Sequence, residues 1–231
     1  MTGKYFKGPI IAAAMLAFAS AACLMMKYPE PGQPVRATEG EALAFGRIAV
    51  IDRDHEIEPW RSDLGDALFA GEKPEIKLSL FLIEANRRAI YVRIEPDGSF
   101  FWVLPTGTYL LYHSHVDRQP ANEPLAAFQI TPGAHALYLG TMTMPIESNE
   151  NRTTGKQDYE VADIQITDEL ERAQQGLVGR YPDLVGSTAR KLMIYDPSLR
   201  DLFQDYSKRE CEKILNQHGI YLLGPDVMRK N

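Results

Sequence analysis

RIEPDGSFFWVLPTGTYLLYHS, residues 93–114, contains two turn signals and the two apolar segments that they border. Asp97-Gly98 and Pro105-Thr106-Gly107 are typical of tight turns, because glycine adopts backbone conformations that other residues disfavour. The segments 99–104 and 108–115 have the aromatic and aliphatic composition of β-strands. This stretch therefore predicts two consecutive strands separated by a short turn.

Similar segments extend outward from this stretch in both directions. Turn signals rich in proline, glycine, asparagine and aspartate separate several of them. Short strands at this spacing favour an antiparallel sandwich or barrel. The further expected strands are 42–52, 76–84, 89–95, 125–130, 135–144 and, after a polar break, 159–166.

Two helices are expected near the end of the chain. Residues 169–181 form the first, because Asp168 followed by Glu171 is a capping-box pattern. The second begins after Asp196, which can cap it, and ends near Gly219. Its apolar face consists of Leu199, Leu202, Phe203, Tyr206 and Ile214.

Both helices are expected to pack on one face of the sheet. Residues 109–112 are apolar at four consecutive positions, which is typical of a strand covered on both sides. The expected fold class is mainly β with C-terminal helices (α+β). It comprises an antiparallel β-sandwich over residues 42–146, followed by a helical extension over 147–231 with two packed α-helices.

Residues 1–22 have the pattern of an export signal. Lys4 and Lys7 precede an apolar segment over 10–19, and small residues follow. The sequence Ser20-Ala21-Ala22-Cys23 resembles the lipobox of bacterial lipoproteins. This resemblance implies that the thiol of Cys23 is acylated and that Cys23 becomes the new N-terminus.

Two other interpretations of this segment remain open. The apolar run continues to Met26, so an uncleaved segment is long enough to anchor the chain in a membrane. Alternatively, Ala19-Ser20-Ala21 is a signal-peptidase site that releases a soluble protein. All three place the remaining chain in the cell envelope, facing the periplasm or the cell exterior. Residues 23–41 are rich in proline and glycine and are expected to form a tether.

Composition restricts the possible partners. The 231 residues are 45% hydrophobic and 24% charged, which is typical of a globular protein. The net charge is −6, and no basic stripe interleaved with aromatics occurs, so nucleic acid is not an expected partner. Membrane contact is expected through the N-terminal lipid or hydrophobic segment. If Cys23 is lipidated, Cys211 has no intramolecular partner, and we expect it to be a buried, inert thiol.

The stretch 93–114 is similar to a theme of carboxypeptidase-regulatory-like and transthyretin-like (prealbumin-like) domains. The resemblance extends over about residues 76–144. It implies a seven-stranded immunoglobulin-like sandwich and a non-catalytic binding or stabilising module, and no catalytic residue carries over. The matching residues are Asp97, Gly98, Phe100, Pro105, Gly107, Tyr109 and Leu111.

A candidate metal site follows in YHSHVD, residues 112–117. On a regular strand, His113, His115 and Asp117 project from one face, where two imidazoles and a carboxylate could hold zinc or copper. The alternative is that these are polar residues at the end of a core strand that emerges into solvent.

The leading functional hypothesis is a non-enzymatic, membrane-anchored envelope lipoprotein that acts as an interaction or accessory module. It depends on the lipobox-like segment and the tether, and it implies an envelope protein partner and no cofactor. One alternative is a metal-binding envelope protein that uses His113 and His115. Another is an envelope hydrolase with an unrecognised site, because paired carboxylates are defined by spatial rather than sequence spacing.

Overall fold

The computed structural model describes residues 29, 35, 37–57, 76–85, 87–116, 119–150, 157–201 and 207–224. The expected signal segment, the lipidation candidate Cys23 and the third candidate metal ligand Asp117 lie outside these residues. Within the described part of the chain, no helix is long and apolar enough to cross a membrane.

A seven-stranded sheet is centred on β1 (Glu41–Asp52) and β8 (Ala136–Glu150), which run parallel to each other. The other edge of β1 pairs antiparallel with two strands, β2 (His55–Ile57) and β5 (Ser99–Pro105). Three short strands line the other edge of β8: β9 (Gln157–Val161), β10 (Gln165–Thr167) and β11 (Thr188–Arg190).

The second sheet has four strands and is antiparallel throughout. Its order is β4 (Arg87–Tyr91), β3 (Ile76–Leu82), β6 (Gly107–Val116) and β7 (Gln119–Ile130). Strands β5 and β6 are consecutive in the chain but belong to different sheets, so the turn between them takes the chain from one sheet to the other. Hydrogen bonds from the backbone N and the Oγ1 of Thr106 to the carbonyl of Gly40 fix this turn.

The two sheets pack face to face around one apolar core. Alternate residues of each strand point into it, as the two-residue period of a strand requires. From β5 these are Phe100, Trp102 and Leu104, and from β6 they are Tyr109 and Leu111, all buried. The chain is therefore mainly β, a sandwich with C-terminal helices, as the sequence predicts.

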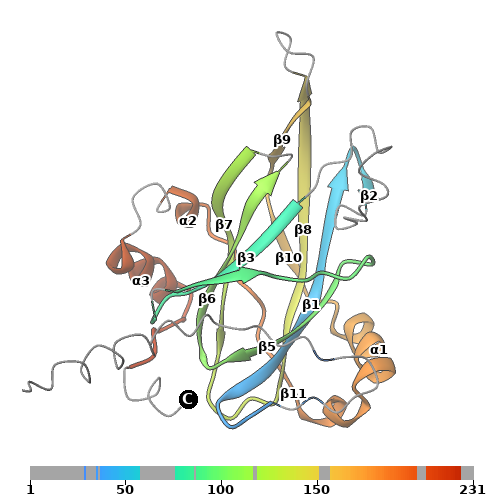
Figure 1. Ribbon diagram of the computed structural model, residues 1–231, viewed down its shortest axis with the longest axis vertical. Coiled ribbons are helices and arrows are strands. Elements are labelled where there is room, and N and C mark those ends of the chain that lie inside the picture. Colours follow the sequence, from blue (N-terminus) through green and yellow to red (C-terminus); the bar gives the residue numbers. More distant parts are fainter. Residues whose placement is uncertain are drawn as a thin grey trace, which may run out of the picture.

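The helices cover opposite outer faces of the sandwich, and the expectation that they share one face is wrong (Figure 1). Helix α1 (Leu170–Arg180) packs Leu177 onto the seven-stranded sheet, in a cluster that includes Phe101 and Tyr138. Helix α3 (Lys208–Gln217) packs Leu215 onto the four-stranded sheet. Both sheets have a second apolar face, and each face requires its own cover.

The seven-stranded sheet is mixed rather than antiparallel, because β1 runs parallel to β8 and β8 runs parallel to β11. Parallel neighbours cannot be joined by a tight turn and need a long connection. Between β1 and β8 that connection includes the whole four-stranded sheet. Local turn signals therefore could not reveal this pairing.

The second expected helix corresponds to two described helices, α2 (Ser198–Asp201) and α3, with residues 202–206 outside the description. Asp196 accepts a hydrogen bond from Ser198 N (2.9 Å), as expected of the residue that caps this segment. Ser207 separately caps α3. The backbone turns after α3 at Gly219, which has a φ of +73°.

The first helix begins as expected, but its capping differs from the prediction. Asp168 Oδ1 accepts a hydrogen bond from Leu170 N (3.2 Å), and the N-cap position is Glu169, which makes no side-chain capping bond. A short 3₁₀ helix, η2 (Pro182–Ser187), follows α1. The division of the chain at residue 146 stays a prediction, although β8 and the short strands beside it continue the seven-stranded sheet past that point.

Part of the expected tether contacts the folded domain beside α1. Val35 and Ala37 pack against the outer apolar cluster that α1 covers. The hydroxyl of Tyr181, the residue that follows α1, donates a hydrogen bond to the carbonyl of Pro29. The described residues of the expected tether therefore contact the folded domain.

Candidate functional site

The two histidines of the predicted metal site lie on β6, but the strand is irregular between them. His113 pairs with Leu78 and Glu123, whereas His115 pairs with Lys77 and Pro120, so the register shifts on both sides at this point. A bulge breaks the alternation on which the shared-face argument depends. The zinc or copper site stays a prediction, because Asp117 lies outside the described residues. Among the residues that are described, no three His, Cys, Asp or Glu side chains cluster as metal ligands would.

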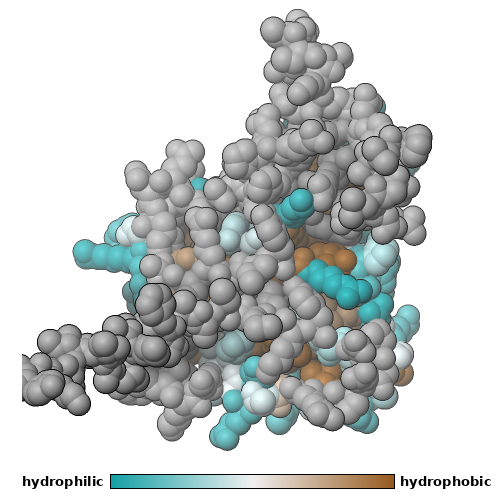
Figure 2. Space-filling model, viewed as in Figure 1, coloured by the Kyte–Doolittle hydropathy of each residue, from teal (hydrophilic) through white to brown (hydrophobic). Residues whose placement is uncertain are grey.

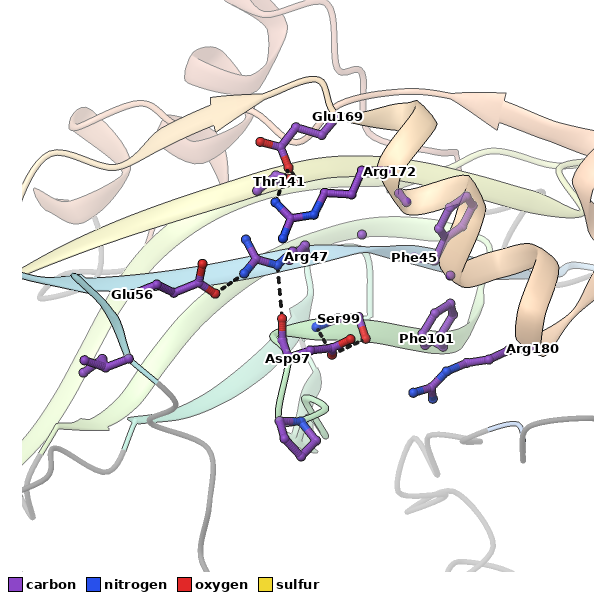
Figure 3. A pocket seen from close by; sticks show the side chains of 15 residues that line it. Phe45, Arg47, Glu56, Asp97, Ser99, Phe101, Thr141, Glu169, Arg172 and Arg180 are labelled. Atoms are coloured by element: carbon purple, nitrogen blue, oxygen red, sulfur yellow. Dashed lines mark hydrogen bonds and ion pairs between the residues drawn. The ribbon is translucent and has the colours of Figure 1, made fainter. Parts of the chain in front are cut away.

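A different site lies on the outer side of the seven-stranded sheet. It is a pocket of about 370 Å³ between α1 on one side and β1, β2 and the turn before β5 on the other. We call it the α1 groove, and its principal residues are Phe45, Arg47, Phe101, Arg172, Gly176 and Arg180 (Figure 3). In the space-filling view, hydrophobic surface is visible between hydrophilic side chains on this side of the molecule (Figure 2).

The floor of the groove is aromatic and rigid. The rings of Phe45 and Phe101 stack with centroids 6.5 Å apart and an interplanar angle of 4°. Tyr138 packs against Phe45, and Tyr181 contacts Phe101 edge to face. Phe45 and Phe101 are only 1% and 8% exposed, so the rings are held in place by packing before any ligand arrives.

A bulge in β8 brings Thr141 to the groove. Tyr138 faces the outer cluster and Leu139 the inner core, so strict alternation would point Thr141 inward. The β1–β8 register shifts here, and Gly140 has a φ of +98°. Thr141 consequently lines the groove, where its Oγ1 donates a hydrogen bond to Glu169 Oε2 (3.1 Å).

Three arginines enter the groove, and they are held to different degrees (Figure 3). Arg47 is 14% exposed, pairs with Glu56 of β2 and donates from Nε to the carbonyl of Asp97 (3.1 Å). Arg172 and Arg180 have looser partners: Arg172 Nη1 lies 3.6 Å from Glu169 Oε2, and Arg180 Nη1 lies 3.7 Å from a carboxylate oxygen of Glu95.

Arg180 also contacts the aromatic floor. Its guanidinium carbon lies 5.1 Å from the centroid of the Phe101 ring, within cation–π range. The groove therefore combines a flat aromatic floor with cationic groups on α1 and carboxylates around the rim. Such a surface can bind a ligand that has both an apolar group and an anionic group.

The carboxyl group of Asp97 stays ionised in the groove. Burial alone would raise its pKa, but hydrogen bonds from the side chain and backbone of Ser99 and the charges of Arg180 and Arg47 produce a net lowering of the pKa. A glycosidase general acid requires the opposite shift. Asp97 is therefore a poor candidate for that role in the hydrolase alternative.

Cys211 is fully buried in the cluster between α3 and the four-stranded sheet. Burial, with smaller contributions from Glu212 and Glu84, raises the pKa of its thiol to about 11. A thiol with this pKa is almost entirely protonated at neutral pH, so the structure favours the inert interpretation.

The fold and the groove define a helix-covered β-sandwich with an open groove on one outer face. No protein-family model matches the chain, and no curated protein is similar to it in sequence. One solved structure with a partial likeness is the Bacillus anthracis TIE protein, at a TM-score of 0.27 and 12% identity. The match covers 54% of this chain and 26% of that one, and at this TM-score it supports no argument about function.

Proposed function

We propose that this protein is a membrane-anchored envelope lipoprotein whose sandwich acts as a non-enzymatic interaction module, with the α1 groove as its binding surface. The observation that carries the proposal is the groove itself. Arginine is enriched at the centres of protein interfaces, and here three arginines line one groove that buried aromatic rings support. Ile57, Pro96 and Ala173 provide accessible apolar area, which the buried Phe45–Phe101 pair supports from below. Arg47, Arg172 and Arg180 provide directional hydrogen-bond donors.

We further propose that the sandwich is of the carboxypeptidase-regulatory-like or transthyretin-like kind. Three features of the motif support this assignment. Gly98 has the positive φ of +80° that the Asp97-Gly98 turn requires. Tyr109 and Leu111 are fully buried in the core, and the hydroxyl of Tyr109 donates a hydrogen bond to the carbonyl of Pro105 (2.8 Å).

The proposed anchor limits how far the groove can lie from the membrane. Pro29 accepts a hydrogen bond from Tyr181 at the end of α1, and it lies six positions after Cys23 in the sequence. An extended chain spans at most about 3.6 Å per residue, so this segment reaches roughly 20 Å. If Cys23 is acylated, this end of α1 lies within that distance of the membrane surface, and the groove is accessible to partners in or near that membrane.

Replacement of the proposed lipidation site tests the anchor. In a bacterial envelope, we expect the wild-type chain to fractionate with membranes and to have an N-terminal mass that shows acylated Cys23. Cys23→Ser should abolish the acylation, while Cys211→Ser, which changes a buried thiol, should leave it intact. Persistence of residues 1–22 on the wild-type protein would contradict the lipid anchor and favour the uncleaved segment.

A further inference from the structure

Helix α1 presents two arginines to the groove with an open position between them. Arg172, Gly176 and Arg180 are four residues apart in turn, so they lie along one face of the helix, and all three line the groove. Eight residues of helix separate the two arginine Cα atoms by about 12 Å. Because Gly176 has no side chain, this space between the arginines is open on the helix side.

No steric or backbone requirement explains glycine at position 176. The place that a Cβ would occupy has no heavy atom of the surrounding described structure within 4 Å, and the φ of Gly176 is not positive. Glycine is unfavourable in a helix interior. Gly179 is equally unrestrained but lies outside the groove, so it provides a matched control on the same helix.

The guanidinium groups of Arg172 and Arg180 make only long ion pairs in this structure, so each can form a closer hydrogen bond with a ligand. The distances of 3.6 and 3.7 Å to Glu169 and Glu95 exceed hydrogen-bonding distance, and Arg172 is 62% exposed. A carboxylate that enters the groove at Gly176 would meet a guanidinium group on either side. Arginine is well suited to this role because its planar group binds carboxylates in a bidentate manner.

The charges on the opposite wall restrict the occupant further. Glu56, Asp97 and Glu169 border the groove, and their oxygens would repel a ligand of high negative charge such as a phosphate-rich headgroup. The same oxygens can accept hydrogen bonds from backbone N–H groups. An extended polypeptide brings such donors at regular intervals, together with an apolar side chain for the accessible apolar residues Ile57 and Ala173.

We propose that the α1 groove binds an extended acidic polypeptide segment, with a glutamate or aspartate carboxylate between Arg172 and Arg180 and a neighbouring apolar side chain against the partly exposed Ile57 and Ala173. This inference rests on the proposed interaction function and specifies the chemistry of the partner.

The test uses the full chain in non-ionic detergent micelles and a fluorescein-labelled hexapeptide that has one glutamate next to one leucine and uncharged polar residues elsewhere. Binding is followed by fluorescence anisotropy against a baseline of empty micelles, and the comparison peptide has glutamine in place of glutamate. We expect the glutamate peptide to bind about tenfold more tightly, because charge-assisted hydrogen bonds are stronger than neutral ones. The double variant Arg172→Gln/Arg180→Gln should remove this preference.

Two glycine variants separate the groove from helix stability. Gly176→Leu should weaken binding of the glutamate peptide about tenfold by filling the open position, whereas Gly179→Leu should leave it unchanged. Leucine is a better helix former than glycine, so thermal melting should show that neither variant is less stable. Loss of binding in Gly176→Leu therefore could not be attributed to unfolding.

Several results would overturn the inference. These are equal affinity for the glutamate and glutamine peptides, no binding of either peptide, and unchanged binding by Gly176→Leu. Phosphatidylglycerol vesicles form a further arm, in which a groove-dependent interaction with vesicles but not with peptides would also reject a polypeptide ligand. An envelope partner that binds Gly176→Leu as well as wild type, but still cross-links to a benzophenone amino acid at Pro96 of the groove, would overturn this inference while leaving the proposed function intact.

Discussion

Gly98→Ala should destabilise the protein by roughly 2–5 kcal/mol, whereas Gly133→Ala should cost only about 1–2 kcal/mol. The two glycines have nearly the same φ, +80° and +78°, so both variants incur the left-handed backbone penalty. At Gly98 an added Cβ would also lie 2.2 Å from the carbonyl oxygen of Ile48, while at Gly133 it would meet no heavy atom of the described residues within 4 Å.

The excess cost at Gly98 comes from the junction between β1 and the turn before β5. The carbonyl of Gly98 accepts a hydrogen bond from Ile48 N (2.8 Å), so the clash cannot be relieved without disturbing this contact. Urea denaturation followed by circular dichroism measures the free energy of unfolding of both variants. Equal losses of stability in the two variants would show that the backbone at Gly98 does not lie as close to Ile48 as the structure has it.

Leu177→Ala and Leu215→Ala should each cost about 2–5 kcal/mol, because both side chains are fully buried and each leaves a cavity. Their local effects should differ, since the helices cover opposite sheets. Leu177→Ala should accelerate amide hydrogen exchange mainly in α1 and its contacts with the seven-stranded sheet. Leu215→Ala should act mainly on α3 and the four-stranded sheet.

Hydrogen exchange read by mass spectrometry distinguishes these patterns, and each variant is the control for the other. Leu177→Ala should also weaken binding at the α1 groove, because Leu177 lies among the aromatic residues that form its floor. If both variants loosened the same sheet, the arrangement with one helical layer on each outer face would be contradicted.

Strands were the most predictable part of the fold, because alternation and turn residues are local signals. Gly98 illustrates this, since the expected positive φ is present. Gly107, for which the same explanation was expected, does not have a positive φ. An added Cβ at Gly107 would instead lie 2.4 Å from Leu82 Cδ1, so close packing against β3 explains the glycine. That contact joins two strands and could not be derived from the turn sequence.

The candidate site could not be predicted in the same way. Arg47 lies on β1 and Arg172 on α1, and only the fold brings residues so distant in sequence to one groove. Sequence reasoning offered His113 and His115 as an alternative site, because their two-residue spacing is visible along the chain. One usable signal was available, the spacing of Arg172, Gly176 and Arg180 on an expected helix. The bulge at Gly140, which turns Thr141 toward the groove, was indicated in the sequence only by a glycine within an expected strand.

Photo-cross-linking in the intact envelope tests the central claim most directly. A benzophenone amino acid replaces either Pro96, an exposed residue of the α1 groove, or Lys213, an exposed residue on α3 at the opposite face. The account predicts a specific adduct with an envelope protein from position 96 and none from position 213. An adduct from position 213 alone, or the same adducts from both positions, would contradict the α1 groove as the binding surface.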